Sequence, residues 1–151
     1  MIDLSSEFRK AYSGDAWHGN NLSSIVSSVR YKNAYRRPIA NAHTIAELVL
    51  HITAWTEEVI SRLMDHMSKD PDRGDWPVVE EESSEAWDVI LSEFHIANEK
   101  LNNLAMMITD EQWRENVSRP TDVKQAKWEL LNGLIQHHAY HGGQISLLLK
   151  F

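Results

Sequence analysis

Residues 44–67 read TIAELVLHITAWTEEVISRLMDHM and have the pattern of one long amphipathic helix. Thr44 and Glu47 form a capping-box sequence, in which the hydroxyl and the carboxylate each accept a hydrogen bond from a backbone N–H of the first turn. Apolar residues then recur every three or four positions, which is the period of a helix with one buried face. They are Leu48, Ile52, Trp55, Val59 and Leu63. His51 lies on the same stripe, so we expect its imidazole to point into the protein.

The rest of the chain also has helical periodicity. Nothing alternates at period two over more than a few residues, and the longest segment without a helical pattern is 69–82, which contains Pro71, Gly74 and Pro77. At 151 residues and 42% apolar composition, the chain has the length of one domain, residues 1–151. The sequence therefore predicts an all-α fold, a four-helix bundle. The remaining expected helices cover residues 2–12, 22–31, 84–108 and 122–149, with a capped turn at 109–113.

Composition excludes several classes of protein. The chain has no cysteine, which removes disulfides, thiolate zinc sites, iron–sulfur clusters and thiol nucleophiles. Its net charge of −7 disfavours non-specific binding to nucleic acid or anionic membranes. The first twenty residues lack the apolar core of a signal peptide, and no apolar run approaches the roughly 20 residues of a membrane span. We therefore expect a cytoplasmic protein with neither a nucleic acid nor a membrane as partner.

Two histidines on the last predicted helix have the spacing of metal ligands. His137 and His141 are separated by four positions, so their imidazoles lie one turn apart on one side of the helix. Both continue the apolar stripe of Leu130, Leu134, Ile145 and Leu148. Together with His51 they would make a facial three-histidine site with open positions. Imidazole ligands suit Zn²⁺ and Ni²⁺ first, with Fe²⁺, Mn²⁺ or Cu²⁺ as alternatives.

The positions of these histidines along their helices predict the topology. His51 lies about 10 Å from the start of its helix, whereas the pair lies about 26 Å from the start and about 18 Å from the end of the last helix. The three rings come closest to one level if the two helices are antiparallel. That arrangement requires segment 69–82 to be a long crossover between the second and third helices, which gives an up-down-down-up bundle.

Other polar residues near the predicted site are candidates for supporting roles. Tyr140 could form a hydrogen bond across helices, and Gln144 could orient an imidazole. His18 lies in an N-terminal loop that could fold over the site. His138 points about 100° away from the pair, which favours a supporting rather than a ligating position. Glu47 is explained by the capping box.

Several motifs together resemble the DinB/YfiT-like family. They are Leu50-His51-Ile52 with Trp55, and His137 to Ile145, which carries the local pattern H-x-x-Y-H-x-G-Q. Further matches are Trp17-His18-Gly19, Arg37-Pro38, Ala42-His43-Thr44-Ile45 and Asp75-Trp76-Pro77. The resemblance covers essentially the whole chain. One departure is Gly142, a position at which many members have Arg.

The resemblance implies a four-helix bundle, commonly a homodimer, that binds a divalent metal through His51, His137 and His141. It also implies a small-molecule substrate, because characterised relatives include metal-dependent transferases of low-molecular-weight thiols. A metal with open positions can present a thiol as thiolate to an electrophile, or can activate water for hydrolysis. A metal-dependent thiol S-transferase is therefore our first expectation. The alternatives are a metal-dependent hydrolase and a non-catalytic bundle that binds a metal or small ligand, followed by an adaptor that uses the basic–aromatic run at 30–37.

Overall fold

The computed structural model describes residues 3–151 and shows that this part of the chain is helical. Its only extended pairings are two isolated bridges, Ala16 with Gly19 and Asn116 with Ala126. The prediction of an all-α fold is confirmed. None of the helices in residues 3–151 has the length and apolar composition needed to cross a bilayer. The elements are α1 (Leu4–Ser13), α2 (Leu22–Ser27), α3 (Tyr31–Ala34), α4 (Ile45–Leu63), α5 (Ser84–Met107), a 3₁₀ turn (Gln112–Arg114) and α6 (Lys127–Leu148).

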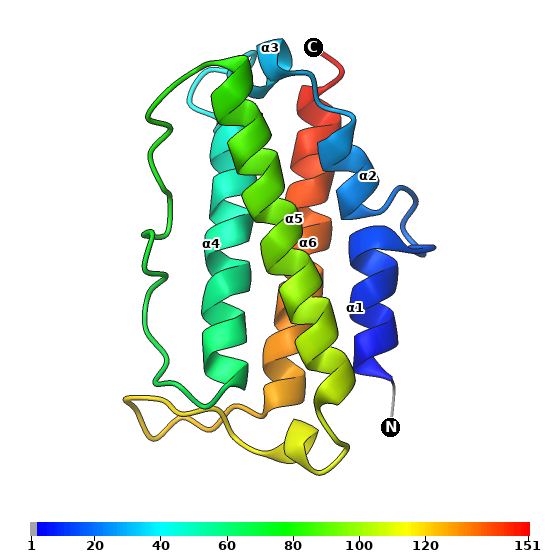
Figure 1. Cartoon of the computed structure of the whole chain (residues 1–151), viewed down its shortest axis with the longest axis vertical. Coiled ribbons are helices and arrows are strands. Elements are labelled where there is room, and N and C mark those ends of the chain that lie inside the picture. Colours follow the sequence, from blue (N-terminus) through cyan, green and yellow to red (C-terminus); the bar gives the residue numbers. More distant parts are fainter. Residues whose placement is uncertain (1–2) are drawn as a thin grey trace.

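Four of these helices lie side by side along the long axis of the molecule (Figure 1). α4 packs on α5 and α6, and α1 packs on the same two helices. In the view of Figure 1, α1 and α6 run upward, whereas α4 and α5 both run downward. The segment between α4 and α5 returns along the full length of α4 to allow this. Thus α4, which carries His51, is antiparallel to α6, which carries His137 and His141.

The start of α4 has the predicted capping box. The Glu47 N–H donates to Thr44 Oγ1 at 3.2 Å, and the Thr44 N–H donates to Glu47 Oε2 at 2.7 Å. Asp3 and Ser83 cap α1 and α5 through their side-chain oxygens. These caps satisfy N–H groups that have no partner inside a helix, and so they fix where each helix begins.

The prediction of a single helix over residues 22–31 is wrong. α2 ends at Ser27, and a short helix, α3, begins at Tyr31 after the extended residue Arg30. The buried Trp87 indole N–H donates to the Val29 carbonyl oxygen at 3.1 Å. That carbonyl therefore bonds to α5, and the chain turns across the end of the bundle.

Two further helix boundaries differ from the sequence prediction. α4 ends at Leu63 rather than near residue 67, because Asp65 adopts a left-handed conformation with φ of 68°. α6 begins at Lys127 rather than near residue 122, because the segment before it forms backbone hydrogen bonds from Val117 to Gln125 and from Lys127 to Glu115. A local change of backbone conformation thus ends α4, whereas backbone pairing with residues 115–117 delays the start of α6.

A buried carboxylate attaches the returning segment to α4. Glu58 is 3% exposed and accepts from Arg62 Nε at 2.8 Å and from the Lys69 N–H at 3.0 Å. Arg62 also donates to the Lys69 carbonyl oxygen at 2.7 Å. Further along, Arg73 donates twice to Glu57 and once to Glu93, which ties the same segment to α4 and α5.

We expect Glu58→Ala to lower the free energy of unfolding by about 3 kcal/mol, because it leaves the largely buried Arg62 guanidinium and the Lys69 backbone N–H without their acceptor. Glu57→Ala is the matched control: its carboxylate is 40% exposed, so the expected loss is at most about 1 kcal/mol. Urea denaturation followed by circular dichroism measures both values. Equal losses in the two variants would contradict the role given to Glu58.

Candidate metal centre

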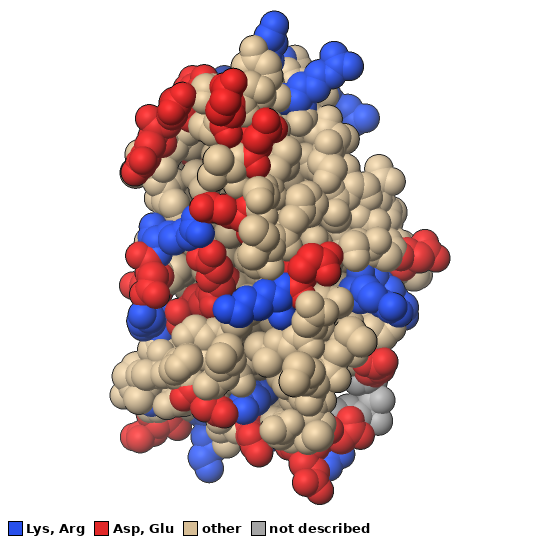
Figure 2. Space-filling view, viewed as in Figure 1, with Lys and Arg blue, Asp and Glu red and all other residues tan. Residues whose placement is uncertain are grey.

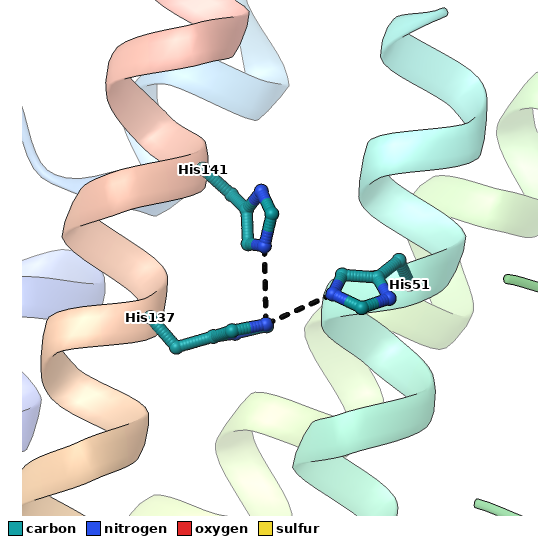
Figure 3. A group of neighbouring side chains, drawn as sticks. All are labelled: His51, His137 and His141. Atoms are coloured by element: carbon teal, nitrogen blue, oxygen red, sulfur yellow. Dashed lines mark hydrogen bonds between the residues drawn. The ribbon is translucent and has the colours of Figure 1, made fainter. Parts of the chain in front are cut away.

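Three histidines from two helices meet between α4 and α6 (Figure 3). His51 comes from α4, and His137 and His141 come from successive turns of α6. The Nε2 atom of His137 lies 2.9 Å from Nε2 of His51 and 3.1 Å from Nε2 of His141. His51 and His141 are each 5% exposed. Nitrogen atoms of the three rings all lie within 4.8 Å of one another, so this group could hold a metal ion.

The crossover segment orients His51. The Nδ1–H of His51 donates to the backbone carbonyl oxygen of Asp75 at 2.5 Å. A carbonyl oxygen can only accept, so this bond places the ring proton on Nδ1 and leaves a lone pair on Nε2. The lone pair faces the other two histidines. A hydrogen bond to the far nitrogen is the usual support for a histidine that ligates a metal.

His141 has equivalent support from its own helix. Its Nδ1–H donates to Gln144 Oε1 at 2.6 Å, so Nε2 of His141 also presents a lone pair. Gln144 is thus in a position to orient the His141 ring. His137 differs, because its buried Nδ1 has no hydrogen-bond partner within residues 3–151.

Two of the three separations between the ring nitrogens, those that His137 makes with His51 and His141, fit a first-row divalent cation. At metal–nitrogen distances of about 2.0–2.1 Å, neighbouring ligand nitrogens are about 2.9 Å apart in an octahedral site and about 3.4 Å apart in a tetrahedral one. The observed 2.9 and 3.1 Å lie in this range. Nitrogen ligands suit Zn²⁺, Ni²⁺, Fe²⁺ or Cu²⁺ better than Mg²⁺ or Ca²⁺.

The surroundings favour the neutral forms of His137 and His141. Burial, with the nearby His141 and His51, lowers the pKa of His137 to about 4. Burial also lowers the pKa of His141, although its hydrogen bond to Gln144 acts in the opposite direction. Near neutral pH the rings of His137 and His141 therefore carry lone pairs rather than positive charge, which is the state that binds a cation.

Trp76 forms a wall of the site that the helical periodicity did not predict. Its indole stacks between His51, at a centroid distance of 3.9 Å, and His43, at 3.6 Å, and it remains 37% exposed. The preceding residue, Asp75, accepts from the Trp55 indole N–H at 2.7 Å through Oδ1. These contacts fix the crossover against α4 at the level of the histidines. The only signal in the sequence was the motif Asp75-Trp76-Pro77.

The other predicted residues lie farther from the group. Tyr140 is 65% exposed, and its ring lies 4.9 Å from that of His141; its hydroxyl has no hydrogen bond within the described residues. His18 is exposed and lines a separate hollow of about 330 Å³ between α2 and α6. Gly142 is buried there, with Leu22 Cδ1 3.4 Å from where a Cβ would lie. Leu22 and Ile25 of α2 thus pack closely against Gly142.

His138 is part of the core rather than of the three-histidine group. It is 1% exposed, and its Nε2–H donates to Asn98 Oδ1 at 2.8 Å. The Asn98 amide in turn donates to the Phe94 carbonyl oxygen at 2.9 Å. His138 therefore joins α6 to α5, as its direction on the helical wheel indicated.

The basic–aromatic run at 30–37 is largely occupied by contacts within the chain. Arg37 bonds to Glu47 and to the Ala42 carbonyl oxygen, and Arg36 bonds to the Phe151 carbonyl oxygen. Figure 2 shows acidic side chains gathered at the upper left, over the end of the crossover and the start of α5. These observations do not favour the adaptor hypothesis.

One family model matches the chain. It is the model of the DinB superfamily, and it covers residues 16–145, which include all three histidines of the site. No curated protein matches the chain.

His138 makes stability depend on pH. Burial lowers its pKa to about 3 in the folded protein, against about 6.5 in the unfolded chain. The unfolded state therefore binds more protons below pH 6.5, and stability falls as the pH drops from about 6.5 toward 3, by up to about 1.4 kcal/mol per unit. We expect the His138 ring ¹⁵N shifts of the folded protein to stay those of neutral imidazole from pH 7 to pH 5. A midpoint near 6.5 would contradict this.

Proposed function

The chain belongs to the DinB superfamily, and on this premise we propose that it is a metal-dependent enzyme whose divalent cation is held by His51, His137 and His141. The observation that carries the proposal is the convergence of three Nε2 atoms from two helices. Two of the rings are oriented by hydrogen bonds on their far side, from Asp75 and Gln144. Histidines that only fill the core would not need their Nε2 atoms to face one another.

We assign the fold to an up-down-down-up bundle of α1, α4, α5 and α6. The helix directions in Figure 1 support this assignment. The crossover supports it as well, because it brings Asp75 beside His51. His51 lies one turn of α4 after Glu47. The topology matters for function because a short loop between α4 and α5 would leave the site without this wall.

We propose Zn²⁺ or Ni²⁺ as the cation and a low-molecular-weight thiol as the nucleophile that attacks a small electrophile. A divalent cation held by His51, His137 and His141 would supply Lewis acidity, which would make a thiol beside it more acidic. Three protein ligands would leave room for a substrate group, and Trp76 and Tyr140 offer aromatic rings beside the histidines. The absence of cysteine means that a thiol must come from a second molecule. The family resemblance supports a thiol over water.

We expect untagged protein to carry about one divalent ion per chain, measured by elemental analysis after dialysis. His51→Ala should reduce this content at least tenfold because one of three ligands is lost. His66→Ala is the matched control, since His66 lies outside the group and bonds only to Ser61. Equal metal content in the two variants, or none in the parent after incubation with Zn²⁺ or Ni²⁺, would overturn the metal site.

Loaded protein is then tested with panels of thiols and electrophiles. Turnover that requires thiol and is lost in His51→Ala supports a transferase. Turnover without thiol indicates the hydrolase, and bound metal without any turnover indicates a non-catalytic binding bundle; either result overturns the transferase proposal.

Trp76→Ala should weaken Zn²⁺ binding about tenfold or more, because it removes the indole that holds the His51 ring in place. Isothermal titration calorimetry gives the dissociation constant. Trp128→Ala, which truncates a partly exposed indole at the start of α6, is the control and should leave it unchanged. Equal affinity in all three proteins would show that Trp76 does not position the ligand.

A further inference from the structure

A serine and a histidine outside the metal centre lie next to each other where α1, α2 and α5 pack together (Figure 1). Ser27 is the last residue of α2 and is exposed, whereas the His95 ring of α5 is partly buried. Ser27 Oγ lies 3.3 Å from His95 Nε2. On the other side of the ring, the hydroxyl of the buried Tyr12 of α1 lies 3.1 Å from Nδ1. An exposed hydroxyl, an imidazole and a buried phenol are thus linked in series.

The protons in this series can be assigned from Glu99, which lies one turn after His95 on α5. Burial and the nearby Glu99 carboxylate raise the pKa of Tyr12, so the phenol keeps its proton. A carboxylate can only accept, and it accepts more strongly than a neutral imidazole, so the Tyr12 O–H is directed at Glu99. The Tyr12 oxygen then accepts from Nδ1–H of His95. This tautomer leaves a lone pair on Nε2, which faces Ser27.

Ser27 therefore has a base beside its hydroxyl, whereas two neighbouring serines do not. Within residues 3–151, the Ser27 hydroxyl forms one hydrogen bond, to His95 Nε2. Burial lowers the pKa of His95, although Glu99 acts in the opposite direction, and the neutral ring can take up a proton. Ser24 instead donates to the Asn21 side-chain oxygen at 2.6 Å, and Ser28 donates to a backbone carbonyl oxygen at 2.7 Å. Amide oxygens of this kind do not act as bases.

We propose that Ser27 is a nucleophile that accepts an acyl group from an activated acyl donor, a thioester or an aryl ester, with His95 as general base. The Ser27 Oγ attacks the acyl carbon, and a new carbon–oxygen bond forms. The bond from that carbon to the leaving group breaks, and the leaving group departs with the electron pair. The Ser27 proton passes to His95 Nε2 and from there to the leaving group. The product is an ester at Ser27.

The backbone around Ser27 favours a lasting modification over hydrolytic turnover. Rapid turnover of an acylated serine depends on N–H groups that are free to stabilise an oxyanion. The N–H groups of Ser28 and Val29 both donate to carbonyl oxygens of α2. The donor must therefore be activated, and the acyl group stays on Ser27. The series includes none of the three histidines of the metal centre, so its failure and the failure of the metal site are distinguishable.

Acylation of the parent protein tests the proposal without any substitution. The protein is incubated with p-nitrophenyl acetate and digested, and tandem mass spectrometry follows the acetylated fraction of each serine. Ser24, Ser27 and Ser28 are all exposed, so access does not distinguish them. We expect Ser27 to be acetylated at least about tenfold faster than either neighbour, since a general base contributes about 10²–10⁴-fold. Equal rates at the three serines would overturn the proposal.

Substitution of the base tests the role of His95. His95→Gln should slow acetylation of Ser27 at least about tenfold, because an amide keeps a polar contact but takes up no proton. Tyr12→Phe keeps the buried ring and removes the hydroxyl that fixes the tautomer, so we expect a smaller loss. His66→Gln is the matched control, because His66 also lies 3.3 Å from a serine hydroxyl, that of Ser61, and should leave the Ser27 rate unchanged. An unchanged rate in His95→Gln, or an equal loss in His66→Gln, would contradict general-base catalysis by His95.

Discussion

Three imidazole rings with facing lone pairs lie between two helices, with His51 and His141 buried and His137 partly buried, and this arrangement is costly without a shared ligand. His51 and His141 hold their protons on Nδ1, so both direct a lone pair at Nε2 of His137. If His137 carries its proton on Nε2, it can satisfy one of them, but its own buried Nδ1 then has no partner. If it carries the proton on Nδ1, three lone pairs converge. Each unsatisfied buried polar atom costs about 1–3 kcal/mol. A cation at the focus would remove the cost of the converging Nε2 lone pairs.

The crossover between α4 and α5 contributes directly to the site, because two of its residues contact His51. Two antiparallel neighbouring helices can be joined by a few residues. Because α4 and α5 run in the same direction, the segment that joins them has to span the length of α4 (Figure 1). Its cost in chain entropy is offset by specific contacts: Glu58 and Arg62 hold its first part, and Trp55 holds Asp75. The same contacts bring the Asp75 carbonyl oxygen and the Trp76 indole to His51. Stability and site geometry therefore depend on the same segment.

Much of this arrangement follows from sequence periodicity. The capping box at Thr44, the inward stripe of α4 and the spacing of His137 and His141 are local signals, and local chemistry decides each of them. The end of α2, the late start of α6 and the stacking of Trp76 could not be predicted this way. In each case a partner far along the chain decides the outcome: Trp87 takes the Val29 carbonyl oxygen, and Glu115 pairs with Lys127. The periodicity of a short stretch of sequence does not show which residues outside that stretch will bind to it.

α6 differs in composition between its two sides. Its inward side follows the 3.6-residue period and includes the histidines, whereas its exposed side includes Gly133 and Gly143. The two glycines lower helix propensity by about 1 kcal/mol each relative to alanine. Within residues 3–151 no contact requires them, since a Cβ at either position would meet open space. A small residue at an exposed helical position therefore leaves the helix backbone open to whatever approaches it from outside the chain.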